Sequence, residues 1–208
     1  TTTGKTYIDL VLMNKTGIIS AKYWGEAPLP ASGDILDVNA SVTEYNGKLQ
    51  LRLEALVLAP EDVDKSEFLP FAPCPIDEML NEVLSAVMEI KDQELRLLVS
   101  ELIGEAGEKF KVFPAAKQMH HAEIGGLLHH ITSMLNLAKG IAVNYPELNR
   151  DLLIAGVIVH DLGKLQEMER NELGLVTDYT VQGRLVGHIV SGAINIERVG
   201  QKLGISEN

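Results

Sequence analysis

The spacing of apolar residues changes along this 208-residue chain, and that change constrains the fold more than any other feature. Over residues 1–60, apolar and polar side chains alternate with the period of two that half-buried strands show. Beyond residue 75, apolar residues recur every three or four positions, as on one face of a helix. Four of the eight prolines fall at 59–75, a composition typical of a linker. The sequence therefore predicts a small β domain at 1–60, a Pro-rich linker at 61–75 and an all-α domain at 76–208.

Turn signals divide the first region into strands. Asn14–Gly17 separates two alternating runs, and Asn46-Gly47 supplies the positive φ angles of a tight hairpin between the next two. The four runs cover residues 7–13, 18–24, 36–42 and 49–54. We expect a meander, with a Pro-containing insert at 27–31 between the second and third strands.

Four strands leave the edges of a sheet open, so a closed barrel needs one more. The chain begins with Thr1-Thr-Thr-Gly4, without an initiator methionine, and Thr-Gly is typical of the end of a turn. We therefore expect the first strand to lie upstream, and residues 1–60 to form a small barrel of the oligonucleotide/oligosaccharide-binding (OB) type. A plain β-meander packed on the helical region is the alternative.

Helical periodicity predicts five helices in the second region. They cover approximately residues 76–88, 95–102, 121–142, 150–162 and 186–203. Together with the strands, they indicate an α+β protein of more than one domain.

Charge and cysteine content exclude some classes of protein. The net charge of −11 argues against charge-driven wrapping of nucleic acid and against a role on a membrane surface, but it leaves a local basic or aromatic groove open. A single cysteine excludes an internal disulfide framework and fits a reducing compartment. We therefore expect a cytoplasmic protein.

The pair His160-Asp161 ends the apolar run that begins at Leu152. Burying an imidazole and a carboxylate there costs free energy unless a partner satisfies both groups, and a divalent cation does so. Neighbouring residues on a helix are about 100° apart, so both can face one ion. A His-Asp dipeptide is common, and its meaning depends on the rest of the chain.

All six histidines lie in the helical region. His130 lies at the margin of the apolar stripe of its predicted helix, whereas His129 points away from that stripe and is expected at the surface. His188 also borders an apolar stretch. With His160 and Asp161, these positions indicate converging metal ligands, and imidazole with carboxylate suits Mn, Fe, Co, Ni or Zn better than Ca or Mg.

Three further residues are candidates for contacts with phosphate. His120 and His121 precede a predicted helix, where they either contact an anion or cap the helix. Lys164 follows His160 by about one turn and either holds a phosphate oxygen or is a surface lysine at a helix end.

Several segments resemble a known family. They are Asn14–Trp24, Glu44–Gln50, Gly125–His130, His160–Lys164 and Gly183–Ile189. His130 with His160–Lys164 resembles the HD superfamily of metal-dependent phosphohydrolases, whose signature is a histidine, a His-Asp pair and a later aspartate. All five segments in this order resemble the YhaM family of bacterial 3′→5′ exoribonucleases, in which an OB domain precedes an HD domain. The resemblance spans essentially the whole chain.

The resemblance implies that His130, His160 and Asp161 bind a divalent transition metal, with Mn²⁺ favoured over Co, Fe, Ni or Zn. His188 matches the additional histidine of HD proteins that hold two ions. The closing aspartate should follow His188, and the sequence reaches Asn208 without one. We therefore expect further C-terminal helices beyond residue 208.

The activity that the resemblance implies is hydrolysis of single-stranded RNA, or of DNA, from the 3′ end to nucleoside 5′-monophosphates. The metal would activate water and polarise the phosphoryl group, with Asp161 and Lys164 as catalytic residues. Two other classes stay open: an HD-type nucleotide phosphohydrolase with a regulatory β domain, and a noncatalytic single-strand-binding factor. The oligomeric state, a homo-oligomer included, is not decided by the sequence.

Aromatic and basic residues of the β region are predicted to bind the nucleic acid. OB domains stack bases on aromatic side chains beside cations. Lys22 and Trp24 share a strand face, and Tyr45 and Lys48 flank the Asn-Gly hairpin. Tyr23 is expected to face the interior by alternation. The alternative is that these aromatic residues are only structural.

Overall fold

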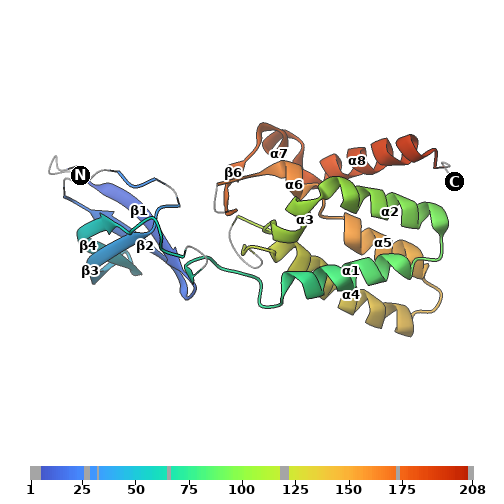
Figure 1. Cartoon of the computed structure of the whole chain (residues 1–208), viewed down its shortest axis with the longest axis horizontal. Helices are drawn as coiled ribbons and strands as arrows, with labels where there is room; N and C mark the ends of the chain where they lie inside the picture. Colours follow the sequence, from blue (N-terminus) through green and yellow to red (C-terminus); the bar gives the residue numbers. More distant parts are fainter. Residues whose placement is uncertain are drawn as a thin grey trace. The chain divides into compact units, whose positions relative to one another are not determined.

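The computed structural model describes residues 6–25, 29–31, 33–64, 67–117, 122–171 and 174–205. The chain divides into two compact units, Thr1–Pro70 and Phe71–Asn208. The first unit contains a four-stranded sheet, and the second is helical with one short β-hairpin (Figure 1). This composition agrees with the predicted pairing of an OB-type domain with a helical domain.

The strands of the first unit do not form the predicted meander. They are β1 (Ile8–Asn14), β2 (Gly17–Tyr23), β3 (Leu36–Tyr45) and β4 (Lys48–Leu58), in the spatial order β1-β2-β4-β3. β1–β2 and β3–β4 are antiparallel hairpins, whereas β2 and β4 pair in parallel. The prediction was wrong because alternation defines strands and their faces but not their partners. The crossed order is compatible with an OB-type Greek-key barrel.

The alternating pattern did predict the two faces of this sheet. Ala21 and Leu53 are buried on one face, and Tyr23 is the register partner of Leu53 on that same face. Lys22 and Arg52 are register partners on the opposite face. The β3–β4 turn places Asn46 at φ 51° and Gly47 at φ 74°, the left-handed pair expected for an Asn-Gly hairpin.

The five predicted helices are present in the second unit. They are α1 (Ile76–Met88), α2 (Gln93–Ala106), α4 (Gly126–Asn144), α5 (Arg150–Val159) and α8 (Gly187–Leu203). Periodicity did not predict the shorter elements, which span too few residues to repeat a pattern. These are α3 (Glu108–Val112), α6 (Lys164–Glu167), β5 (Met168–Arg170), β6 (Val176–Tyr179) and α7 (Val181–Leu185).

The core of the second unit forms between its long helices. α4 packs against α1 and α5, α5 packs against α2, and α2 packs against α8 (Figure 1). Leu127, Leu128 and Ile131 of α4 and Ile154 and Ile158 of α5 are fully buried or nearly so. Because α5 is a core helix, the residues that follow it begin inside the unit. None of the described helices is long and apolar enough to cross a membrane.

Candidate metal centre

Asp161 is the centre of a cluster of polar side chains in the helical unit. Its side chain is only 6% exposed, and it comes two residues after the last residue of α5. The Lys164 ammonium donates to Asp161 Oδ2 at 2.8 Å. Three imidazoles from different parts of the chain also approach this carboxylate. A buried charge so surrounded is typical of a functional site.

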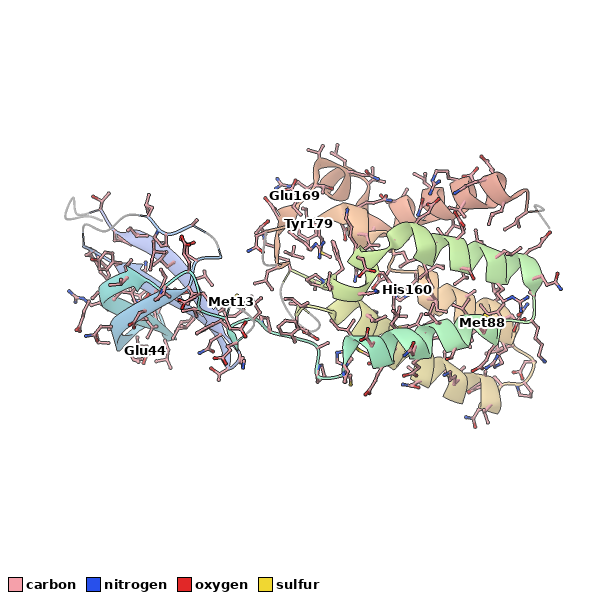
Figure 2. The ribbon with its side chains drawn as sticks, in the orientation of Figure 1. Met13, Glu44, Met88, His160, Glu169 and Tyr179 are labelled. Atoms are coloured by element: carbon pink, nitrogen blue, oxygen red, sulfur yellow. The ribbon has the colours of Figure 1, made fainter. Side chains whose placement is uncertain are left out.

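The core helix α5 delivers His160 and Asp161 to this position. Its first turn is capped by Asn149, whose side chain accepts a hydrogen bond from the Leu152 amide at 3.0 Å. The helix then buries one apolar face and ends at Val159, with His160 as its C-cap. His160 lies at this end of α5 (Figure 2). The predicted apolar run is therefore the element that carries both groups into the interior.

α4 supplies His130 to the same place. His130 Nε2 lies 3.4 Å from Asp161 Oδ2 and 3.4 Å from His160 Nε2. His160 Nε2 lies 3.3 Å from the same Asp161 oxygen. The position of His130 at the edge of the α4 apolar stripe therefore directs its ring towards the end of α5, as the sequence predicts.

Hydrogen bonds orient two of the imidazoles. His160 Nδ1 lies 2.8 Å from the Val157 carbonyl oxygen, which can only accept, so Nδ1 carries the proton and Nε2 faces Asp161. His188 Nδ1 lies 3.0 Å from a Glu167 carboxylate oxygen, and His188 Nε2 lies 3.5 Å from Asp161 Oδ1. Each ring thus turns its Nε2 towards the carboxylate, as metal-binding histidines with an anchored second nitrogen do.

The surroundings of Asp161 favour its ionised form. Burial is the largest influence and opposes ionisation, but the hydrogen bonds and charges of His160 and Lys164 together outweigh it. The pKa of the Asp161 carboxyl therefore lies well below its usual range. The hydrogen bond with Asp161 in turn raises the pKa of His160, against the effect of burial. Asp161 is therefore a carboxylate in this cluster, the form that binds a metal ion.

The donor set fits a divalent metal ion. One ligand atom each from His130, His160 and Asp161 lies within 4.8 Å of the others, the one such group found among the described residues. Ligand atoms bonded to one ion at about 2.1 Å lie roughly 3.0–3.4 Å apart at octahedral to tetrahedral angles. The observed separations of 3.3–3.4 Å match that spacing.

The structure brings some of the predicted site residues together and does not describe others. The structure brings His130, His160 and Asp161 together, with His188 against the other oxygen of Asp161. The Lys164 ammonium donates a hydrogen bond to Asp161. His120 and His121 lie outside the described residues. His129 is partly buried beside Glu123 rather than fully at the surface, with Nδ1 3.3 Å from the carboxylate.

Glu167 is the residue of this cluster that sequence reasoning missed. Its carboxylate also accepts a hydrogen bond from the His188 backbone amide at 3.2 Å. Twenty-one positions separate the two residues, so neither strand nor helix periodicity relates them. No local signal in the sequence identifies this pair.

The predicted nucleic-acid residues of the first unit lie in a second cluster. Lys22 Nζ donates to the Tyr7 hydroxyl at 3.1 Å and lies 4.4 Å from the centroid of that ring. The Arg52 guanidinium lies 5.4 Å from the Trp24 ring centroid, and the Trp24 and Tyr7 centroids are 5.5 Å apart. We call these four side chains, Tyr7, Lys22, Trp24 and Arg52, the Trp24 cluster.

Two other predicted residues lie at the β3–β4 hairpin. Tyr45 is 62% exposed, and its ring centroid is 6.0 Å from Lys22 Nζ. Lys48 is the register partner of Tyr45. Sequence reasoning missed Tyr7 and Arg52, although alternation places both on the polar face. Arg52 joins the cluster through the parallel pairing of β2 and β4, which the sequence did not indicate.

Comparison with known proteins identifies a matching domain family and several similar proteins. Residues 127–207 match the model of the HD domain family. The 3′-5′ exoribonuclease YhaM of Halalkalibacterium halodurans is 36% identical over 97% of this chain and 64% of its own length. The Bacillus subtilis protein of that name is 37% identical over 97% of this chain and 65% of its own length. A Listeria monocytogenes protein of that name is 35% identical over 97% of this chain and 66% of its own length.

These matches confirm the resemblance predicted from the sequence motifs. The chain spans 64–66% of the length of these relatives. No solved structure matches the chain.

Proposed function

Since this chain carries an HD domain and is similar to the YhaM exoribonucleases over 97% of its length, we propose that it is a metal-dependent 3′→5′ exoribonuclease. The observation that carries the proposal is the cluster at the end of α5, where two imidazoles meet a buried, ionised carboxylate. Its substrate is single-stranded RNA, its products are nucleoside 5′-monophosphates, and it works in the cytoplasm.

His130, His160 and Asp161 would hold the metal ion, with His188 beside the second oxygen of Asp161. When bound, a divalent ion there supplies Lewis acidity to the phosphoryl group and lowers the pKa of a water molecule. Imidazole and carboxylate donors favour a transition metal, and we assign Mn²⁺.

Residues around the ion position the reacting groups. The Val157 carbonyl and the Glu167 carboxylate fix the rings of His160 and His188, so no reorientation is needed when the substrate arrives. The Lys164 ammonium lies 2.8 Å from Asp161 Oδ2. The same ammonium can stabilise the negative charge of a nonbridging phosphate oxygen.

Replacing Glu167 by Ala should weaken Mn²⁺ binding about tenfold, because the His188 ring loses the carboxylate that orients it. Electron paramagnetic resonance of free Mn²⁺ measures this affinity directly. Glu169→Ala is the matched control, since Glu169 is an exposed carboxylate on β5. Equal Mn²⁺ affinities for the two variants would contradict the role assigned to Glu167.

The Trp24 cluster is the proposed contact with RNA. Trp24 is 39% exposed and Tyr7 is 36% exposed, so their rings are accessible to bases. Two cations, Lys22 and Arg52, lie beside these rings in a chain whose net charge is −11. Base stacking next to a local positive charge gives binding that tolerates many sequences.

Trp24→Ala should weaken binding of a single-stranded oligoribonucleotide by roughly 5- to 150-fold, the cost of about one lost stack. Fluorescence anisotropy in EDTA measures binding without turnover. Tyr145→Ala, at an exposed aromatic residue of the helical unit, is the control and should bind as the parent does. If both variants bind equally well, the Trp24 cluster does not contact RNA.

End-labelled single-stranded RNA, incubated with Mn²⁺ or with EDTA, tests the proposed activity. Stepwise release of nucleoside 5′-monophosphates only with Mn²⁺ supports the exoribonuclease. Hydrolysis of free nucleotides alone would instead favour a nucleotide phosphohydrolase with a regulatory β domain. Binding without turnover would favour a noncatalytic single-strand-binding factor. A DNA strand of the same sequence measures the preference for RNA.

A further inference from the structure

His188 enters the metal centre from the first turn of a helix, α8. The first four amides of a helix lack partners within it, and the apolar side chain of the N-cap residue, Val186, cannot accept from them. The Glu167 carboxylate accepts from the His188 amide at 3.2 Å and lies 3.0 Å from Nδ1 of its ring. One side chain therefore fixes both the backbone and the ring of His188.

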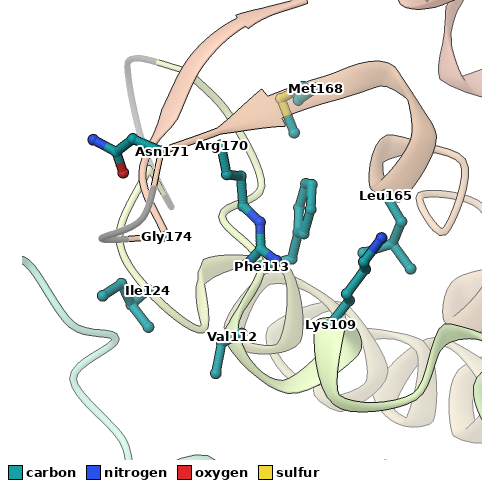
Figure 3. Close-up of a pocket in the computed structure, with 9 residues that line it drawn as sticks. All are labelled: Lys109, Val112, Phe113, Ile124, Leu165, Met168, Arg170, Asn171 and Gly174. Atoms are coloured by element: carbon teal, nitrogen blue, oxygen red, sulfur yellow. The ribbon is translucent and has the colours of Figure 1, made fainter. Parts of the chain in front are cut away.

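Glu167 must in turn be held in place, because its side chain is only 11% exposed. Apolar packing secures its neighbours, since Leu165 and Met168 pack against the hydrophobic core that contains Phe113 (Figure 3). α6 has four residues, so its last two carbonyls, those of Gln166 and Glu167, have no partner within the helix. Their partner must come from another element.

Thr180 supplies that partner from the start of α7. Its backbone amide donates to the Glu167 carbonyl at 2.9 Å. Its hydroxyl lies 2.9 Å from the Gln166 carbonyl oxygen and 3.2 Å from that of Glu167. Both carbonyls can only accept, so the hydroxyl donates its proton to this pair, while its oxygen accepts from the Gly183 amide at 2.9 Å. Thr180 thus joins the beginning of α7 to the end of α6.

α7 approaches Glu167 so closely that no side chain fits between them. A Cβ atom on Gly183 would lie 2.2 Å from the Glu167 carbonyl oxygen and 2.8 Å from its Cγ atom. α7 is also bonded to α8, because the Gln182 amide donates to the buried Ser191 hydroxyl at 3.1 Å. α6, α7 and α8 are therefore joined pairwise by hydrogen bonds of side chains, and Glu167 with His188 is the link between α6 and α8 (Figure 1).

We propose that Thr180 is a positioning residue of the metal centre. Its hydroxyl holds the end of α6, and Glu167 at that end holds the His188 ring towards Asp161. This role rests on the proposed function, which places a metal ion beside His188. Removing the hydroxyl would leave the backbone bond of Thr180 to Glu167 in place, so the hairpin persists while the Glu167 side chain is less well oriented.

Nitrogen NMR of the His188 ring, recorded in EDTA where the imidazole is neutral, measures this positioning without metal. The Glu167 carboxylate can only accept, so the contact at 3.0 Å places the ring proton on Nδ1. Thr180→Val keeps the size of the side chain and removes its hydroxyl. We expect this variant to shift part of the His188 population to the form protonated on Nε2, and Glu167→Ala to shift more of it.

Thr177→Val is the matched control for Thr180→Val. Thr177 is an exposed threonine of β6, and its hydroxyl lies 3.5 Å from the Glu169 carbonyl oxygen rather than against α6. Its replacement should leave the His188 tautomer and the Mn²⁺ affinity as in the parent. Equal tautomer populations in the parent and in Thr180→Val would overturn the proposal.

Mn²⁺ affinity, followed by electron paramagnetic resonance of the free ion, measures the consequence for the metal centre. Thr180→Val should weaken it roughly fivefold, the factor that corresponds to the loss of one typical hydrogen bond. Thr180→Ser keeps the donor and the acceptor, so its affinity should lie within about twofold of the parent. If Thr180→Ser bound Mn²⁺ as weakly as Thr180→Val, the hydroxyl would not be the positioning group, and the proposal would be wrong.

A double-mutant cycle shows whether Thr180 acts through Glu167. In the Glu167→Ala background, Thr180→Val should change the Mn²⁺ affinity by less than about twofold, because the side chain that it positions is gone. A purely structural role would give the same loss in both backgrounds and would overturn the proposal. Thermal unfolding of each variant gives the temperature below which all of them are folded.

The measurements also separate the role of Thr180 from the metal centre itself. Lost Mn²⁺ affinity in Asp161→Asn, together with parent-like affinity in Thr180→Val, would overturn only the role of Thr180. Parent-like Mn²⁺ affinity in Asp161→Asn would refute the metal centre, and with it the role of Thr180 in positioning that centre.

Discussion

Asp161→Asn should reduce Mn²⁺-dependent release of nucleotides from RNA by at least about a hundredfold. The substitution keeps the size of the side chain but removes its charge and replaces one of its oxygens with an amide nitrogen. Oδ2 faces His130, His160 and Lys164, whereas Oδ1 faces His188. Because both oxygens are used, neither orientation of the amide can restore the site.

The measurement pairs end-labelled RNA degradation with Mn²⁺ affinity. Asp77→Asn is the matched control, since Asp77 is an exposed aspartate in the first turn of α1 and should leave both quantities unchanged. Because the pKa of Asp161 is lowered in the folded protein, its ionised form stabilises the fold at pH values above the usual pKa of an aspartate. Asp161→Asn therefore loses some stability at neutral pH. Both assays should therefore be run well below the melting temperature. Full Mn²⁺-dependent activity in Asp161→Asn would place the metal elsewhere.

Gly163→Ala is the second large expected effect, and it acts on stability. A Cβ atom on Gly163 would lie 2.1 Å from the His188 carbonyl oxygen and 3.0 Å from the Gly192 amide nitrogen. Both are backbone atoms of α8, so no side-chain rotation relieves the overlap. We expect a loss of about 2–3 kcal/mol or more in the free energy of unfolding, because α6 and α8 must separate.

Gly156→Ala is the control for this substitution. Gly156 lies within α5, and a Cβ there meets no atom within 4 Å. Replacing a helical glycine by alanine in open space should raise stability by up to about 1 kcal/mol. The two variants should thus shift the urea midpoint in opposite directions. Equal midpoints would show that α6 and α8 do not approach so closely.

Gly163→Ala should also affect the metal centre. The His188 carbonyl that the new methyl group would strike belongs to the residue whose ring faces Asp161. Displacing α8 therefore moves His188 away from the carboxylate. Gly163→Ala should weaken Mn²⁺ binding even at temperatures where it is fully folded, whereas Gly156→Ala should not.

Local sequence patterns were sufficient to predict most of the elements and part of the site. Alternation predicted four strands and the face that carries Lys22 and Trp24. Helical periodicity predicted the five long helices and placed His130 at the margin of an apolar stripe. These features were predictable because strand and helix geometry repeat every two or 3.6 residues, so neighbours in sequence determine which side a residue faces.

The sequence by itself thus determined which residues face inward on each element. It also placed His160 and Asp161 at the end of the apolar run that forms α5. Only the tertiary structure decided which elements meet. The parallel pairing of β2 with β4 and the contact of Glu167 with His188 join segments whose local patterns contain no information about each other. Gly163 shows the same division, since its φ of −59° suits any residue and only the nearness of α8 requires a glycine there. A periodic pattern depends on the residues of a single segment, whereas a tertiary contact depends on two segments at once.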